Sequence, residues 1–106
     1  MTAFQFKLQL KNIKEDLKGL TIQFCSDGNV TPFKTLKEFG NAVLEAQNKN
    51  NDFHILRVWN NGVVKSVTSF DQLKKEIKNG ANAVSFSANK DYKTFSNAMS
   101  SDGFLD

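Results

Sequence analysis

Two stretches near the beginning of the chain alternate between apolar and polar residues. In residues 3–10 the apolar set is Phe4, Phe6, Leu8 and Leu10, and the polar set is Gln5, Lys7 and Gln9. In residues 20–25 the sets are Leu20, Ile22 and Phe24 against Thr21, Gln23 and Cys25. A period of two is typical of a strand with one buried face. We therefore expect two antiparallel strands, joined by residues 11–19 as a loop or a single helical turn.

The next segment has the turn and cap residues, and the spacing of apolar residues, that are typical of a helix. Residues 26–29 (Ser-Asp-Gly-Asn) are typical of a turn, Thr31 is a suitable N-cap, and Pro32 suits the first helical position. Apolar and small residues then recur every three or four positions up to Gln47: Phe33, Leu36, Phe39, Gly40, Val43 and Leu44. We expect one amphipathic helix, which ends in the polar residues 48–51.

A hairpin, a short helix and a strand complete the pattern. Residues 53–59 and 63–67 flank Asn61-Gly62, the strongest hairpin signal in the chain. Ser69 is a good N-cap with Gln72 as its capping-box partner, and Asn79-Gly80 is a typical helix end. Residues 83–88 form the last expected strand. Residues 90–99 are compatible with a third helix, and residues 100–106 with a flexible tail.

This order predicts a single α+β domain over residues 1–99. Without the first strand, the order βαββαβ is ferredoxin-like. With every strand used, the order ββαββαβ resembles the ubiquitin-like β-grasp, in which one mixed sheet of about five strands carries its helices on one face. We prefer the second arrangement. The expected open face of the sheet is polar and poor in aromatic residues: Gln5, Lys7, Gln9, Thr21, Gln23, Cys25, Ser85 and Ser87.

The second half of the chain resembles a PB1 domain. The similarity covers residues 55–64 (Ile-Leu-Arg-Val-Trp-Asn-Asn-Gly-Val-Val) and residues 68–73 (Thr-Ser-Phe-Asp-Gln-Leu). The family's acidic partner-binding turn is replaced by the uncharged Asn60 and Asn61, so only the basic side of PB1-type pairing is implied. Lys7 would match the lysine of the family's first strand.

The composition narrows the class of protein. The 106 residues carry a formal charge of +3, which permits an acidic protein or a nucleic acid as partner. The single cysteine excludes an internal disulfide and fits a reducing, cytoplasmic location. No signal peptide or membrane span is expected. The abundance of Asn and Lys suggests an AT-rich genome, and the pattern does not specify an oligomeric state.

No constellation for catalysis is visible in the sequence. His54 and Cys25 are each the only residue of their kind and lie in distant strands, so they do not make a metal site. Asp52 is expected on the face opposite His54, which leaves the imidazole without an orienting partner. Cys25 falls on the polar face, where its thiol would be exposed. We expect no catalytic residue, no cofactor and no metal.

The candidate contact residues are those of the second hairpin. Arg57 and Trp59 share one face of their strand, and Trp and Arg are enriched among residues that dominate binding energy. The expected partner surface also includes Asn60, Asn61, Lys65 and Lys7. The alternative is that Trp59 closes the end of the core.

Lysines on the expected helices give a second candidate surface. Lys74, Lys75 and Lys78 lie away from the apolar stripe of the second helix, and Lys34 and Lys37 do the same on the first. They form either a solvated face or an electrostatic contact. The sequence thus favours a small non-enzymatic protein-interaction module, an adaptor or a phage or mobile-element inhibitor. The alternative is a nucleic-acid-binding domain.

Overall fold

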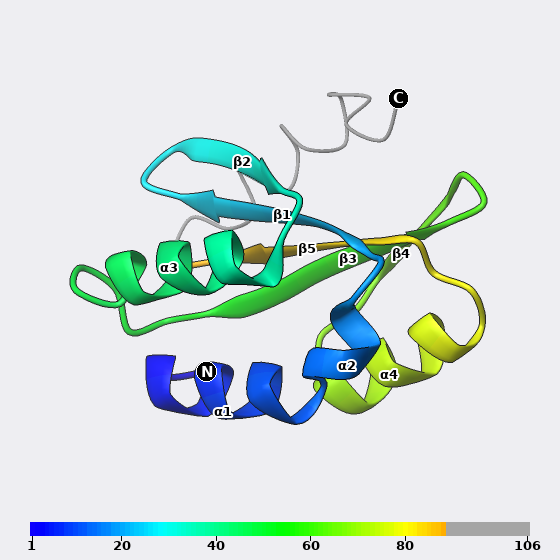
Figure 1. The fold of residues 1–106 in the computed structure, drawn as a ribbon, viewed down its shortest axis with the longest axis horizontal. Coiled ribbons are helices and arrows are strands. Elements are labelled where there is room, and N and C mark those ends of the chain that lie inside the picture. Colours follow the sequence, from blue (N-terminus) through cyan, green and yellow to red (C-terminus); the bar gives the residue numbers. More distant parts are fainter. Residues whose placement is uncertain (89–106) are drawn as a thin grey trace.

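The computed structural model describes residues 1–88 of the chain. Its elements follow in the order shown in Figure 1: α1 (Ala3–Asn12), α2 (Lys14–Leu17), β1 (Thr21–Ser26), β2 (Asn29–Phe33), α3 (Leu36–Ala46), β3 (His54–Asn60), β4 (Val63–Ser66), α4 (Phe70–Lys78) and β5 (Ala83–Ser87). The third helix expected at residues 90–99, the domain boundary at residue 99 and the tail lie outside the described residues.

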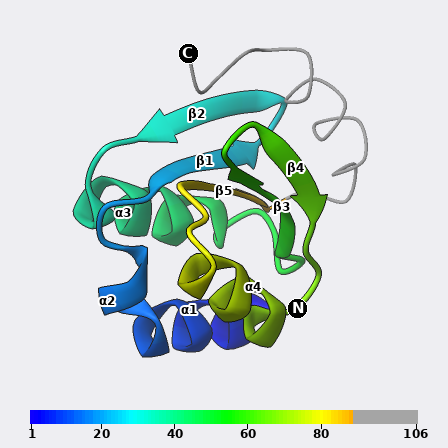
Figure 2. The same cartoon turned by 90° about the vertical axis from the view of Figure 1, so that its right-hand side faces the viewer.

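One mixed sheet holds the five strands in the order β2-β1-β5-β3-β4. The hairpins β1–β2 and β3–β4 are antiparallel, and β5 lies between them, parallel to β1 and antiparallel to β3. All four helices lie on one face of the sheet, as Figure 2 shows. The α+β class and the β-grasp-like arrangement are therefore confirmed. The ferredoxin-like alternative is wrong because β1 lies between β2 and β5.

Phenylalanines fill the core between the helices and the sheet. Phe6 of α1 packs against Phe53 and Phe86, with ring centroids 4.9 and 5.3 Å apart. Phe39 of α3 packs 5.3 Å from the same Phe86 ring. Aromatic pairs at these separations add to the free energy gained by burying their area. Helices α1 and α3 and the central strand β5 thus share one aromatic cluster.

The prediction of a strand at residues 3–10, paired with residues 20–25, is wrong. The segment is helix α1, capped by Thr2, whose hydroxyl accepts a hydrogen bond from the backbone N–H of Gln5 while the Gln5 side chain accepts one from the N–H of Thr2. Phe6 is buried, whereas Phe4 and Leu8 are 73% and 48% exposed. The alternating pattern of residues 3–10 also contains a spacing of three and four residues, which is typical of a helix.

The predicted helix start at Thr31 and Pro32 is also wrong. Asp27 and Gly28 both have positive φ, 51° and 79°, as a two-residue hairpin turn requires. The chain therefore returns along β1 as strand β2, with Pro32 at the edge of the sheet, where its missing N–H removes no internal hydrogen bond. Helix α3 begins after Thr35, whose hydroxyl accepts a hydrogen bond from the N–H of Glu38.

The second hairpin, α4 and β5 agree with the pattern, apart from a β-bulge. The register between β3 and β5 shifts between Ile55 and Arg57. As a result Ile55 and Val58, three residues apart, both belong to the main core, while Leu56 and Trp59 belong to a second cluster with Cys25 and Ala83. One inserted residue therefore breaks the strict alternation that the sequence suggests.

The sheet face away from the helices is not the open polar surface that the alternation predicted. Cys25, Gln23, Ser85 and Ser87 are all buried, and only Thr21 of the predicted set on the strands is exposed. Gln5, Lys7 and Gln9 lie on α1 instead of a strand.

Candidate functional site

A groove of about 690 Å³ lies between α1–α2 and the start of α3. We call it the basic groove. Its apolar and small lining residues are Leu10, Leu17, Gly19, Leu20, Ile22, Phe33, Leu36, Phe39 and Gly40. Four of them, Leu10, Leu20, Phe33 and Leu36, are half-buried and pack against the main core. The groove is therefore a place where the apolar core reaches the surface.

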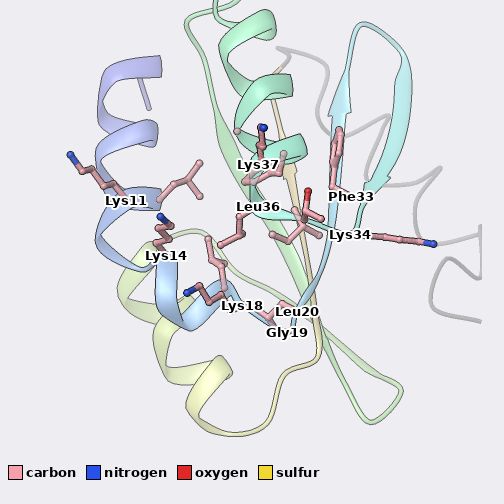
Figure 3. Close-up of a pocket in the computed structure, with 15 residues that line it drawn as sticks. Lys11, Lys14, Lys18, Gly19, Leu20, Phe33, Lys34, Leu36 and Lys37 are labelled. Carbon is pink, nitrogen blue, oxygen red and sulfur yellow. The ribbon is translucent and has the colours of Figure 1, made fainter.

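Among residues 1–88, five lysines and no acidic residue line the same groove: Lys11, Lys14, Lys18, Lys34 and Lys37. In Figure 3, Lys14 and Lys18 come from the α2 side and Lys37 from the α3 side, while Lys11 and Lys34 extend to opposite outer sides. All five are exposed. Exposed side chains of this length change rotamer within nanoseconds, so the ammonium groups are not held in one position.

Most of this positive charge is not neutralised within the fold. Lys18 pairs with Glu15, Nζ to Oε2 3.0 Å, but no other groove lysine has an ion pair within residues 1–88. A smaller hollow beside the β1–β2 turn contains Asp27 and Lys49, whose charged atoms lie 3.4 Å apart. The basic groove thus combines an apolar floor with net positive charge, whereas the smaller hollow carries both signs of charge and pairs its lysine with Asp27.

Gly40 occupies an unusual position on the groove wall. It lies inside α3, where glycine costs about 1 kcal/mol relative to alanine. A Cβ atom at this position would meet nothing within 4 Å, so packing within the fold does not require glycine. Leu44, one turn further along α3, is 49% exposed. Leu36, Gly40 and Leu44 therefore form one stripe at a spacing of four residues.

The predicted anchor residues lie elsewhere. Trp59 is on the sheet face away from the helices, but it is only 8% exposed, so in this structure it is not an exposed anchor. Arg57 is half-buried.

The other predicted contact residues have mixed positions. The Asn60 side chain donates a hydrogen bond to the carbonyl of Asn79 over 3.0 Å, and Asn61 has the positive φ of the hairpin turn. Lys65 pairs with Glu76 of α4, 3.4 Å apart. Lys7 lies on α1, not on a first strand, and β1 contains no lysine to serve as the PB1-type basic residue. The structure therefore does not place Lys7 on the hairpin with the others.

The second predicted surface is present on α4. Lys74, Lys75 and Lys78 are all exposed. None of them has an ion pair within the described residues. They form a basic helix face without the apolar floor that distinguishes the basic groove.

His54 has a carboxylate partner, contrary to expectation. Its Nε2 lies 3.0 Å from Oδ1 of Asp52, so the predicted opposite orientation of Asp52 is wrong. Asp52 precedes the strand, where the alternation of faces does not apply. Ser87 is the cross-strand partner of His54, but it is completely buried, so a substrate would not reach its hydroxyl. Within residues 1–88, the pair thus has the form of an acid–base couple whose cross-strand hydroxyl is not accessible.

Cys25 is buried rather than exposed, and this corrects the prediction of an accessible thiol. Desolvation by burial raises the pKa of Cys25 from 9.0 to about 12. A thiol is a nucleophile only as the thiolate, so Cys25 is inert at neutral pH. Within residues 1–88 no three His, Cys, Asp or Glu side chains gather closely enough to hold a metal ion.

The basic groove was missed because its residues were assigned to other elements. Lys7, Lys11, Lys14 and Lys18 recur every three or four residues, which is a helical signal. The strand prediction for residues 3–10 hid it. Lys34 and Lys37 were noticed, but only as part of a helix face.

The chain matches no protein-family model, no curated protein and no solved structure. Among the helices of residues 1–88, none has the length and apolar character of a membrane span.

Proposed function

We propose that this protein is a small non-enzymatic protein-interaction module that binds its partner through the basic groove. The observation that carries the proposal is the combination of an apolar floor with five lysines and no acidic lining residue. Apolar area supplies affinity, while a field of one sign speeds association and selects a partner of the opposite sign. The module would act as an adaptor, or as a phage or mobile-element inhibitor that occupies a host protein.

The chemistry of the described residues supports a binding role over catalysis. Among residues 1–88, the Ser87 hydroxyl opposite His54 is buried, and Cys25 is a buried, protonated thiol. A site for nucleophilic catalysis needs a nucleophile, a base and an orienting group around one reacting atom. The basic groove contains only lysine as a titratable side chain.

Nucleic acid is the second candidate partner, favoured by the exposed lysines of α4. Single-stranded nucleic acids bind through stacking on aromatic side chains as well as through phosphate contacts. The basic groove offers only the half-buried Phe33 and the buried Phe39 among mostly aliphatic residues. An apolar, aliphatic floor suits a protein segment better than a stacked base.

Affinity capture with matched variants tests the proposal. The groove variant carries Lys11→Gln, Lys14→Gln and Lys37→Gln, and the control carries Lys74→Gln, Lys75→Gln and Lys78→Gln. Both lose the same charge, and none of the six lysines has an ion pair in the described part.

We expect nuclease-treated lysate of the native host, at moderate salt, to yield one stoichiometric protein with wild type and control but not with the groove variant. The purified pair should then form a complex when mixed. Capture of nucleic acid with a steep loss of binding at higher salt would favour the alternative. Equal capture by all three proteins would refute the groove as the binding site.

A further inference from the structure

The wall that α3 contributes to the basic groove is a straight apolar track. Leu36 and Gly40 line the groove, and Leu44 continues the same stripe as an exposed residue. At about 1.5 Å per residue the track is roughly 12 Å long. In Figure 1, α1 and α3 lie on the same face of the sheet, so an occupant of the groove would rest between two helices.

Gly40 is placed where it allows a close approach. A Cβ atom would have open space there, so the missing side chain leaves room on the groove side of α3. Glycine makes the free helix less stable, and it permits another backbone to come near. The track is therefore shaped for a broad apolar surface of an occupant at Gly40, flanked by contacts with Leu36 and Leu44.

The walls of the groove favour a helix as the occupant. An added strand gains affinity from the backbone groups of an exposed sheet edge, but the wall beside the track is α3, whose interior backbone groups are already bonded within the helix. A helix instead presents apolar residues every three or four positions, which matches the spacing of the track. A helix-in-groove contact uses side-chain packing alone and needs no free backbone edge.

The charges specify the sign of the occupant and disfavour a second copy of this chain that would present one of its basic faces. The groove is lined by five lysines, so acidic side chains on the flanks of the bound helix would be paired. The whole chain carries a net charge of +3, and α4 adds exposed lysines of its own. Two copies would repel each other at this surface.

We propose that the basic groove binds an acidic amphipathic helix of the partner, laid along Leu36, Gly40 and Leu44. The carboxylates of that helix pair with Lys14 and Lys37 on the two sides of the groove. The inference rests on the proposed function in that the partner is a protein, and it adds the form and the charge of the segment that is recognised.

A synthetic peptide panel tests the inference without knowledge of the natural partner. The probe is a fluorescent helical peptide of about 14 residues, close to four turns, with leucines on one face and glutamates beside them. A scrambled peptide of the same composition lacks the apolar face, and a second peptide has glutamine in place of glutamate. We expect the probe to bind, and both control peptides to bind about tenfold more weakly or worse, in fluorescence anisotropy.

Protein variants locate the bound peptide. Gly40→Leu fills the middle of the track and should weaken probe binding at least about tenfold, whereas Gly40→Ala adds one methyl group and should change it much less. The triple groove variant with Lys11→Gln, Lys14→Gln and Lys37→Gln should also lose binding, and the triple α4 variant should retain it. Melting curves of each variant check that the fold is intact, as the open space at Gly40 leads us to expect.

Two results with the synthetic probes would overturn the inference. Equal binding of the probe and the scrambled peptide would show that charge alone is recognised, and stronger binding of single-stranded DNA would point to nucleic acid. The proposed function fails separately, if no protein forms a complex that depends on the groove lysines. A captured partner that binds Gly40→Leu at full strength would contradict the binding of a partner helix along α3. The proposed function would still stand.

Discussion

Cys25 couples the stability of the fold to alkaline pH. Its pKa is raised by burial from 9.0 to about 12, so the unfolded chain loses the thiol proton at lower pH than the folded chain. The contribution of the protonated thiol is complete below about pH 9 and is lost as the pH rises toward 12. Burial of this one side chain therefore acts on the stability of the whole domain.

We expect the free energy of unfolding to fall between pH 9 and 12 more steeply for the wild type than for Cys25→Ala. Urea unfolding of both proteins across this range measures the difference. Parallel pH profiles would show that Cys25 titrates normally in the folded state and would contradict its burial.

A second prediction about a single residue concerns Trp59. Because its side chain is buried with Leu56, Cys25 and Ala83, Trp59→Ala should cost about 3–5 kcal/mol of stability. Thermal or urea unfolding measures the loss. A variant that melts like the wild type but fails to bind the captured partner would restore Trp59 as a surface anchor.

Gly40 and Gly62 provide a matched pair of glycines. Gly40 lies within helix α3 with open space around it, so Gly40→Ala should stabilise the protein by about 0.5–1 kcal/mol. Gly62 has a φ of +81° in the hairpin turn, so Gly62→Ala should destabilise it. Opposite shifts of the melting temperature are the expected outcome. A loss of stability in Gly40→Ala would mean that the fold itself needs this glycine.

Among the elements, α1 shows why alternation alone is not decisive. Residues 3–10 alternate strictly, yet Ala3, Phe6 and Leu10 also recur at three and four residues, which is the spacing of a helix face. Thr2 and Gln5 form a capping box, and Gln, Lys and Leu are good helix formers. The sequence contains both the strand spacing and the helix spacing, and packing against the aromatic core selects the helix.

The helix and strand interpretations of α1 differ in a measurable way. A strand would place Phe4, Phe6 and Leu8 on one buried face, whereas the helix buries only Phe6 among them. We expect the double variant Phe4→Gln and Leu8→Gln to change stability little, and Phe6→Ala to cost about 3–5 kcal/mol. Urea unfolding of the two variants gives the comparison. Severe destabilisation by the double variant would favour the strand.

Turn chemistry explains which other elements the sequence predicted. Asn61-Gly62 and the Ser69 cap act locally, so the second hairpin and α4 were predictable. The Asp27-Gly28 turn was recognised as a turn, but Pro32 after it suggested a helix start rather than an edge strand. The edge position of β2 depends on the whole sheet, and short-range signals do not contain it.

At the scale of the whole molecule, the sequence likewise predicted the features that local signals determine and missed the candidate site. The mixed sheet and its helices on one face followed from the number and order of the elements, even though the first hairpin was misplaced by one strand. The basic groove did not follow, because α1–α2 and α3 meet only in the folded chain. Surface lysines are common in any sequence. The groove lysines differ because, in the folded chain, they surround apolar residues of the core that reach the surface.

Among the strands of residues 1–88 the central one, β5, is made last, and this affects how the sheet forms during synthesis. β5 pairs with β1 and β3, each of which belongs to a hairpin made earlier. On a ribosome that adds about 5–20 residues per second, both hairpins wait for seconds with one edge unpaired. Cooperative folding of the sheet is therefore delayed until residues 83–87 have been made. Until then, the unpaired edges of both hairpins expose the nascent chain to aggregation.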